Sequence, residues 1–346
     1  MRVGILTGGG DCPGLNAVIR AVVRVGVDHY GHQHVGILHG WQGLMQHEIR
    51  PMPRPAVRGI LHRGGTILRS SRVSPYHVDG GPEIVAESVK RLGLDAIVVI
   101  GGDGTLSVAS RLHQDFGLPI IGVPKTIDND IGLTDFTFGF STAVEVAVDA
   151  IDRLHTTAES HDRVIVVEVM GRHVGWIATH AGIAGGADYI LIPEYPRPID
   201  DVIAAIRRRH DRGAEFSIIV IAEGYRLEGV PEGRTDEYGH ERLDEVDPGA
   251  RLTDIINKRT DFDARSVVLG YLQRGGSPNA FDRLLATRLG AFASKLVDRR
   301  EFGAMASLQR NKIVSVPVAD AVATDKPVPR ELYEVLDRLS SVPPGP

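Results

Sequence analysis

Residues 96–106 read AIVVIGGDGTL, in which five apolar residues lead directly into glycines, a carboxylate and a hydroxyl. Residues 2–11 follow the same plan and read RVGILTGGGD. A continuous apolar run of this length is typical of a strand that is buried on both faces of a parallel sheet. Because ligands of such sheets bind beyond the carboxyl ends of the strands, the two glycine loops are the first candidates for a binding site.

Similar β-branched runs recur along the chain, and segments with helical periodicity lie between them. Strands are expected at Arg2–Thr7, His34–Leu38, Ala96–Ile100, Pro119–Val123, Arg163–Met170, Tyr189–Pro193, Phe216–Ala222, Ser266–Leu269 and Lys312–Val316. Helices are expected, for example, at Leu15–Tyr30, Ala143–Thr156, Ile199–Arg212 and Arg283–Val297. This alternation predicts a doubly wound α/β architecture. At roughly 150 residues per domain, the chain length predicts two domains.

The composition narrows the class of protein. The chain has 39 Lys and Arg against 44 Asp and Glu, and this acidic balance argues against a dedicated nucleic-acid binder. Cys12 is the single cysteine, so intrachain disulfides and a cysteine-built zinc site are excluded. The apolar runs are much shorter than the ~20 residues of a membrane helix, and the first residues enter a strand pattern without a signal peptide. We therefore expect a cytoplasmic protein with neither a nucleic-acid nor a membrane partner.

The two glycine loops have the features of a phosphate site. The loop Gly8–Gly14 precedes an expected helix, so its backbone N–H groups can bind an anion. Pro13 breaks the dinucleotide spacing G-x-G-x-x-G, and the sequence has no Gly-Lys dipeptide, which excludes a P-loop. Asp103 in the second loop suits Mg²⁺ that is held by one carboxylate, substrate phosphates and water. Either loop alone could be a structural turn, but together they favour a nucleotide or diphosphate site.

A third candidate segment, Pro124–Asp130, follows another expected strand. It carries Asp128 and Asp130 beside Lys125 and Thr126. Buried carboxylates are costly unless they bind a cation or accept a proton. Taken alone, the segment is better interpreted as a solvated turn, because Asn and Asp favour turns.

Taken together, these segments resemble the 6-phosphofructokinases over nearly the whole chain, from Leu6 to about Pro317. The segments that carry the resemblance are Gly8–Asn16, Gly101–Leu106, Pro124–Asp130, Glu168–Trp176, Ala222–Gly224 and Leu269–Pro278. Gly-Gly-Asp-Gly-Thr occurs in other kinases too, whereas Thr-Ile-Asp-Asn-Asp combined with Met-Gly-Arg and Gln-Arg-Gly-Gly is specific. Gly104 with Lys125 also resembles a mixed-substrate, actinobacterial-like subgroup.

The resemblance implies two doubly wound, mainly parallel-sheet domains with the active site in the cleft between them. It places a donor-binding domain at residues 1–138 plus about 252–304. A sugar-phosphate-binding domain is placed at residues 139–251 plus about 305–325. Residues 326–346 are expected to form a C-terminal tail.

The activity that the resemblance implies is transfer of a phosphoryl group from ATP to the 1-hydroxyl of fructose 6-phosphate, a step of glycolysis that yields fructose 1,6-bisphosphate. Asp128 matches the catalytic base, and a carboxylate can take the hydroxyl proton as the oxygen attacks. Arg72, Thr126 and Arg172 match further catalytic residues, and Asp103 matches the Mg²⁺-associated carboxylate. The implied donor-site residues are Gly10, Arg72, Gly102, Gly104 and Thr105.

The acceptor site implied by the resemblance contains several arginines, as suits bidentate binding of a phosphate. Its residues are Thr126, Asp128, Arg163, Met170, Gly171, Arg172, Glu223, Arg265, Tyr271 and Arg274. The family usually has histidine at position 271, and Tyr271 keeps a hydrogen-bond donor without the charge. A homodimer or homotetramer is also implied, in which Arg163 and Arg265 serve the site of the neighbouring subunit.

Gly104 and Lys125 match the two positions that the family associates with the choice of donor. Glycine at 104 leaves room for the α-phosphate and nucleoside of ATP, where pyrophosphate enzymes have aspartate, but Lys125 is the residue that pyrophosphate enzymes have. Because a clash excludes a ligand and one lysine only adds attraction, ATP is the expected donor. Pyrophosphate as donor, or another acceptor such as sedoheptulose 7-phosphate, stays open.

Two other classes of protein are weaker alternatives. A nicotinamide dehydrogenase is disfavoured by the spacing of the first loop. A catalytically inactive sugar-phosphate binder would not need Asp103 and Asp128 together.

Overall fold

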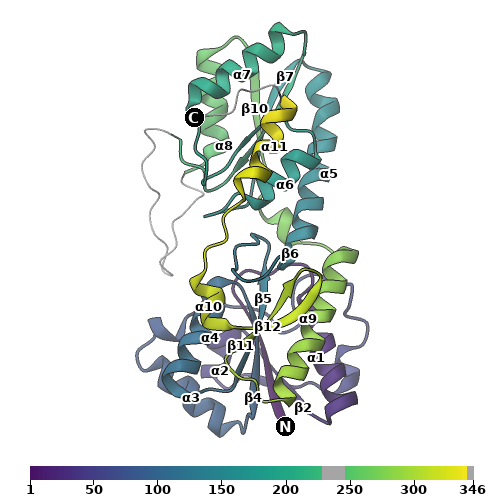
Figure 1. Cartoon of the computed structure of the whole chain (residues 1–346), viewed down its shortest axis with the longest axis vertical. Helices are drawn as coiled ribbons and strands as arrows, with labels where there is room; N and C mark the ends of the chain where they lie inside the picture. Colours follow the sequence, from purple (N-terminus) through teal and green to yellow (C-terminus); the bar gives the residue numbers. More distant parts are fainter. Residues whose placement is uncertain (228–245, 341–346) are drawn as a thin grey trace. The chain divides into compact units, whose positions relative to one another are not determined.

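The computed structural model describes residues 1–227 and 246–340. The chain forms two compact units, which are drawn in Figure 1. The first unit consists of Met1–Thr142 and Arg274–Lys326, and the second of Ala143–Gln273 and Pro327–Pro346. Each unit has its own sheet and its own hydrophobic core.

An eight-stranded sheet is the basis of the first unit, in the order β12-β11-β5-β4-β1-β2-β3 with β6 beside β5. Its strands are β1 (Arg2–Gly8), β2 (Gln33–Ile37), β3 (Ile49–Pro51), β4 (Ala96–Gly101), β5 (Ile120–Thr126), β6 (Phe138–Gly139), β11 (Ala304–Gln309) and β12 (Lys312–Pro317). The central strands are parallel, whereas the outer pairs β2/β3 and β11/β12 are antiparallel. Gly8 at the end of β1 lies beside Gly101 of β4, which lies beside Pro124 of β5. The three candidate loops therefore leave the sheet at the same edge.

Helices cover both faces of this sheet (Figure 1). They are α1 (Leu15–Tyr30), α2 (Gly40–Met45), α3 (Gly81–Arg91), α4 (Asp103–Phe116), α9 (Ala280–Asp298) and α10 (Val318–Ala323), with 3-10 turns at Arg54–Val57 and Pro75–His77. Helices α1 and α9 pack closely because Gly290 has no side chain; a Cβ there would lie 2.7 Å from the carbonyl oxygen of Val18. Side chains of α2, α3, α4 and α10 form a core with strand residues such as Leu6, Ile97 and Val99.

The second unit has a four-stranded, fully parallel sheet in the order β10-β7-β9-β8. Its strands are β7 (Arg163–Val169), β8 (Tyr189–Leu191), β9 (Ser217–Ala222) and β10 (Asp263–Val268). Its helices are α5 (Phe140–Glu159, which begins in the first unit), α6 (Trp176–Ala184), α7 (Ile199–Asp211), α8 (Pro248–Arg259) and α11 (Arg330–Ser340), with a 3-10 turn at Gly270–Arg274 whose last residue belongs to the first unit. Val164, Ile219 and Leu252 are central to its core.

The predicted fold class is confirmed, because both sheets are mainly parallel and alternate with helices in two compact units. Strands β3, β6 and β11 were not expected from the sequence. β6 has only two residues, β3 ends in proline, and the β11 segment AMASLQ has no β-branched residue. No helix within residues 1–227 or 246–340 is long and apolar enough to span a membrane.

The units divide the chain differently from the expected domain ranges. Residues 252–273 belong to the second unit, because β10 pairs with β7. Residues 305–325 belong to the first unit, because β11 pairs with β5 and β12 pairs with β11. Helix α11 occupies much of the range expected as a tail, and residues 341–346 lie outside the described part. The assignment of a substrate to each domain stays a prediction.

Candidate active site

The first glycine loop, after β1, depends on backbone conformations that favour glycine. Gly9 has φ of 76° and Gly14 has φ of 109°, which L side chains rarely adopt. The N–H of Gly9 donates to the carbonyl oxygen of Ser71 at 3.0 Å, and the Ser70 hydroxyl donates to the carbonyl oxygen of Gly9. These bonds bring the segment that carries the exposed Arg72 alongside the first glycine loop.

Thr105 joins the first glycine loop to the second. Its side chain is buried and packs against the ends of both β1 and β4. A Cβ on Gly8 would lie 2.7 Å from Thr105 Cγ2, and a Cβ on Gly101 would lie 2.3 Å from Thr105 Cβ. Only glycine at these two positions allows this approach. Packing against Thr105 therefore requires both glycines, whether or not a ligand binds at the loops.

The second glycine loop ends in an exposed carboxylate beside open space. Asp103 is the first residue of α4, and a Cβ on Gly104 would meet no atom within 4 Å. The described residues contain no group of three His, Cys, Asp or Glu side chains that could hold a metal. Mg²⁺ commonly binds through one carboxylate together with phosphates and water. Asp103 therefore fits a Mg²⁺ ion that binds with the donor phosphates.

Lys125 lies where the glycine loops approach each other. The residue is only 3% exposed, and its amine donates a hydrogen bond of 2.5 Å to the carbonyl oxygen of Gly10. A Cβ on Gly9 would lie 3.5 Å from the amine nitrogen, and one on Gly102 would lie 3.8 Å from it. Burial lowers the pKa of Lys125. An anion bound at the glycine loops would therefore stabilise the charged amine.

In the loop after β5, hydrogen bonds hold Thr126 and Asn129, which lie on either side of Asp128. The N–H of Asp128 donates to the Thr126 hydroxyl at 3.0 Å, and the Thr137 hydroxyl donates to the Thr126 carbonyl oxygen at 2.8 Å. Asn129 is fully buried with φ of 54°, a conformation that Asn tolerates better than most residues. Its Oδ1 accepts from the Thr137 N–H at 3.1 Å. The half-buried carboxylate of Asp128 thus comes from a fixed loop at the edge where the glycine loops end.

Arg274, expected in the acceptor site, lies against the first glycine loop. Its Nη1 donates to the carbonyl oxygen of Asp11 at 3.3 Å. A Cβ on Gly10 would lie 2.6 Å from the same nitrogen, so Gly10 allows the guanidinium to approach the backbone. This cation belongs to the same unit as Lys125. Its predicted contact with the sugar phosphate stays a prediction.

In the second unit, Arg163 of β7 and Arg265 of β10 meet at one carboxylate. Arg163 Nε lies 2.9 Å from Asp263 Oδ2, and Arg265 Nη1 lies 2.5 Å from Asp263 Oδ1. The side chains of the two arginines are 31% and 54% exposed. Both guanidinium groups therefore retain surface from which an anion could be bound.

A second group of predicted acceptor residues gathers at the ends of β7 and β9. The N–H of Glu223 donates to the Val169 carbonyl oxygen at 2.8 Å, and the N–H of Gly171 lies 3.4 Å from the Glu223 carboxylate. Gly171 has φ of 144°, and a Cβ there would lie 2.6 Å from the Val174 carbonyl oxygen. The buried Met170 and the half-buried Arg172 flank this glycine in the chain. The structure thus brings these four predicted residues together.

Tyr271 is placed differently from these residues. It lies in the 3-10 turn Gly270–Arg274 and is 77% exposed. Gln273 of the same turn is fully buried and accepts a hydrogen bond from the N–H of Met170 at 3.3 Å. The turn is therefore anchored beside the acceptor residues through Gln273, and the Tyr271 ring extends from it into solvent.

Glu168 is a buried acid to which the sequence assigns no role. The carboxylate accepts a hydrogen bond of 2.8 Å from the N–H of Gly249. Burial raises the pKa of Glu168 to about 7, while the Gly249 bond opposes this shift. The sequence does show an acidic residue near the end of an apolar strand. The pattern of apolar residues does not predict, however, whether the carboxyl group of that residue is buried or solvated.

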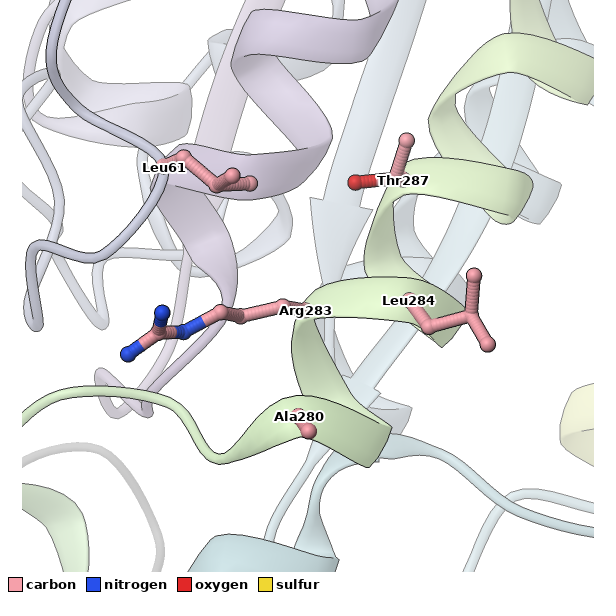
Figure 2. A pocket seen from close by; sticks show the side chains of 5 residues that line it. All are labelled: Leu61, Ala280, Arg283, Leu284 and Thr287. Atoms are coloured by element: carbon pink, nitrogen blue, oxygen red, sulfur yellow. The ribbon is translucent and has the colours of Figure 1, made fainter.

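A pocket of about 580 Å³ lies elsewhere in the first unit, between Leu61 and helix α9. Figure 2 shows Ala280, Arg283, Leu284 and Thr287 on α9, with Arg283 and Leu284 on the same turn of the helix. Its lining is mostly apolar and includes none of the residues predicted for the donor or acceptor site. It is therefore not the candidate active site.

Comparison with known proteins agrees with the resemblance. The chain matches the family model described as phosphofructokinase over residues 2–297. It is 53% identical to the pyrophosphate–fructose 6-phosphate 1-phosphotransferase of Amycolatopsis mediterranei, over 96% of this chain and 98% of that protein. It is 52% identical to the ATP-dependent 6-phosphofructokinase 3 of Streptomyces coelicolor, with the same coverage.

A solved structure agrees as well. The phosphofructokinase of Pichia pastoris in the T-state matches with a TM-score of 0.81 and 34% identity over 93% of this chain, which spans 35% of that longer chain. The chain therefore belongs to the phosphofructokinase family. The predicted family and enzyme class, a 6-phosphofructokinase, are confirmed. The named relatives use different donors, so the donor is not decided by the comparison.

Proposed function

We propose that this enzyme transfers the terminal phosphoryl group of ATP to the 1-hydroxyl of fructose 6-phosphate. The observation that carries the proposal is the shared edge of β1, β4 and β5. The two glycine loops follow β1 and β4, Lys125 lies near the end of β5, and Asp128 follows β5. The amine of Lys125 and the backbone of Asp128 are both held by hydrogen bonds. The open space beside Gly104 supports ATP, because a donor larger than pyrophosphate needs room at this loop.

On the donor side, the protein supplies backbone N–H groups and cations. Gly10, Gly102 and Thr105 lie in or beside the loops that would receive the phosphates, and Arg72 would approach them from the Ser71 segment. When bound at Asp103, Mg²⁺ would neutralise part of the phosphate charge. Positive groups fixed before the reaction stabilise the spread negative charge of the transition state without a reorganisation cost.

At the reacting atoms, Asp128 would accept the proton of the acceptor hydroxyl. The hydrogen bond between the Asp128 N–H and Thr126 fixes the backbone from which the carboxylate extends. Thr126 would also lie next to the transferring group, and Arg172 would contribute a further positive charge. Holding a base within hydrogen-bond reach of its proton typically contributes ~10²–10⁴-fold to the rate.

For the acceptor, we assign the sugar to the loop residues of the second unit. Met170, Gly171 and Glu223 lie close together at the ends of β7 and β9 and would contact the sugar ring. Arg163, Arg265 and Arg274 would bind the 6-phosphate, in keeping with the preference of guanidinium for phosphate.

Pyrophosphate is the second candidate donor, and Lys125 is the observation that favours it. A buried amine among the glycine loops suits a small, highly charged donor that has no nucleoside to bind. The pyrophosphate-dependent relative at 53% identity points the same way. Sedoheptulose 7-phosphate is the second candidate acceptor, since Tyr271 is uncharged where the family usually has histidine.

The test is a matrix of initial rates, with ATP and pyrophosphate as donors and with fructose 6-phosphate and sedoheptulose 7-phosphate as acceptors. We expect the highest kcat/KM for ATP with fructose 6-phosphate, and full dependence of that rate on Mg²⁺. A higher kcat/KM with pyrophosphate would show that pyrophosphate, and not ATP, is the preferred donor. A higher kcat/KM with the longer sugar would overturn the acceptor assignment. Glycolysis and the cytoplasm remain the expected setting.

A further inference from the structure

The segment after α10 packs tightly onto the chain that follows Asp130. A Cβ on Gly132 would lie 2.5 Å from both the Cβ and the carbonyl oxygen of Thr324. The N–H of Gly132 also donates to the carbonyl oxygen of Ala321 at 3.2 Å. Only glycine allows this contact, so the end of α10 and the residues after it are fixed against the loop that carries Asp128.

Lys326 extends from this segment to the loop itself. Its amine donates to Asn129 Oδ1 at 2.8 Å and to the carbonyl oxygen of Asp135 at 2.9 Å. Asn129 is the immediate neighbour of Asp128, and its Oδ1 is the same atom that accepts from the Thr137 N–H. One amine thus connects the two ends of the segment 129–135.

The far end of that segment is held by β11. The N–H of Asp135 donates to the Leu308 carbonyl oxygen at 2.7 Å, and the N–H of Leu308 donates to the Thr134 hydroxyl at 3.0 Å. Lys326 therefore connects the Asn129 side chain to a rigid part of the sheet. Without the amine, Asn129 Oδ1 would keep the Thr137 contacts alone.

The charges around Lys326 agree with this geometry. Burial lowers the pKa of Lys326 to about 8, and the carboxylates of Asp130 and Asp135 oppose that shift. Asp325 and Arg310 line the same small pocket of about 290 Å³. At pH 7 the amine is therefore mostly protonated and can donate three hydrogen bonds.

We propose that Lys326 is a positioning residue, whose amine fixes the Asn129 side chain and thereby holds the neighbouring Asp128 carboxylate in its reactive position. The inference rests on the proposed role of Asp128 as the base. Position 326 lies outside the residues matched by the family model. It also lies in the range that the sequence analysis expected to be a tail.

The experiment is a kinetic double-mutant cycle with Lys326→Met and Asp128→Asn. Lys326→Met should lower kcat by roughly 10-fold or more with ATP and fructose 6-phosphate, since small misplacements of reacting groups cost up to ~10²-fold. The KM values of both substrates should change by less than about threefold, because the affected group acts on the proton and not on binding. The double variant should be no slower than Asp128→Asn alone, because Lys326 would act only through that carboxylate.

A matched control is Lys312→Met, which removes an exposed lysine from the same unit. Rates are normalised to the folded fraction, measured by circular dichroism and the thermal midpoint. Propylammonium should restore part of the activity of Lys326→Ala, whereas propanol should not, because the small pocket beside the amine can admit a cation of that length.

Three results would overturn the inference: a folded Lys326→Met enzyme with kcat close to the wild type, multiplicative effects in the double variant, or failure of both Lys326 variants to fold. The last would assign Lys326 to stability instead. Normal kcat in Asp128→Asn alone would reject the proposed base itself, so the two failures are distinguishable.

Discussion

The amine of Lys125 donates a hydrogen bond of 2.5 Å to the carbonyl oxygen of Gly10, which connects the end of β5 to the loop after β1. The two residues are 115 positions apart in the sequence and meet because β1, β4 and β5 are adjacent strands. A buried cation bound to the backbone of an anion-binding loop is placed to contact the donor phosphates.

Lys125→Met should therefore affect the two donors unequally. We expect kcat/KM with pyrophosphate to fall at least ~30-fold and that with ATP only a few-fold, because pyrophosphate has no nucleoside contacts to compensate for a lost charge-assisted bond. Initial rates with both donors at saturating sugar phosphate measure this difference. Lys90→Met, at an exposed lysine of α3, is the control. An equal loss with both donors would mean that Lys125 has only a structural role.

Gly104→Asp tests the steric argument for ATP. The position has no neighbouring atom within 4 Å of an added Cβ and no positive φ, so the substitution should leave the fold unchanged. A carboxylate would obstruct and repel the α-phosphate, and we expect kcat/KM with ATP to fall by about 100-fold or more while pyrophosphate remains a substrate. Gly104→Ala is the matched control and should keep most ATP activity. Unchanged ATP turnover in Gly104→Asp would disprove the argument.

Asp128→Asn preserves the shape of the side chain and removes the proton acceptor. We expect kcat to fall by roughly 10²–10⁴-fold, with little change in the KM of fructose 6-phosphate. The Thr126 hydrogen bond to the Asp128 backbone should survive, so the thermal midpoint should be nearly unchanged. Asp79→Asn, at an exposed carboxylate, serves as the control. A variant that retains normal kcat would show that another group takes the proton.

Glu168 predicts a pH dependence of stability. Its pKa rises from 4.5 to about 7 on folding, chiefly through burial. Between these values the folded state binds more protons than the unfolded state, so the contribution of Glu168 to stability falls as the pH rises from about 4.5 to about 7 and is then constant. Gln at this position has no charge to bury and can still accept the Gly249 hydrogen bond.

Urea unfolding of wild type and Glu168→Gln between pH 4.5 and 8 measures this contribution. The variant should gain free energy of unfolding relative to the wild type as the pH rises, by at most roughly 3 kcal/mol above pH 7. Glu87→Gln, at an exposed acid, should show no such trend. A constant difference across the range would mean that Glu168 is not neutral in the folded state at low pH.

The parallel sheet, and the edge of it at which a ligand would bind, could be predicted because both depend on local sequence. The apolar runs before Gly101 and Gly8 are readable as buried strands, and glycine loops after such strands lie at one edge once the strands are adjacent. Position 271 could be recognised as a departure from the family, but its 77% exposure follows from the anchoring of Gln273 in the fold.

The remaining features depend on contacts between distant positions. Lys326 meets Asn129 across 197 residues, and no periodicity links a lysine in an expected tail to a loop after β5. Arg274 reaches the first glycine loop across 263 residues. Strand β11 was missed because its residues are weak strand formers, and pairing with β5 and β12 determines its conformation.

Arg163 and Arg265 both contact Asp263 in the single chain, which keeps two partly exposed arginine side chains together. If the enzyme is an oligomer in which these residues serve a neighbouring subunit, two inactive variants should complement each other. A hybrid dimer of Asp128→Asn and Arg163→Ala chains contains one site with an intact base and an intact arginine. Random mixing should restore about a quarter of the wild-type activity, because half of the dimers are hybrids and each has one complete site.

The control for complementation pairs Asp128→Asn with Arg72→Ala. Both positions lie in the first unit of the chain, so no hybrid site should be complete and no activity should return. Chains with different affinity tags are co-expressed, the hybrids are purified through both tags, and native mass spectrometry verifies their composition before the assay. If verified Asp128→Asn/Arg163→Ala hybrids remain inactive, Arg163 serves the site of its own chain. The ion pair between Arg163 and Asp263 must then break within one subunit before the arginine can bind phosphate.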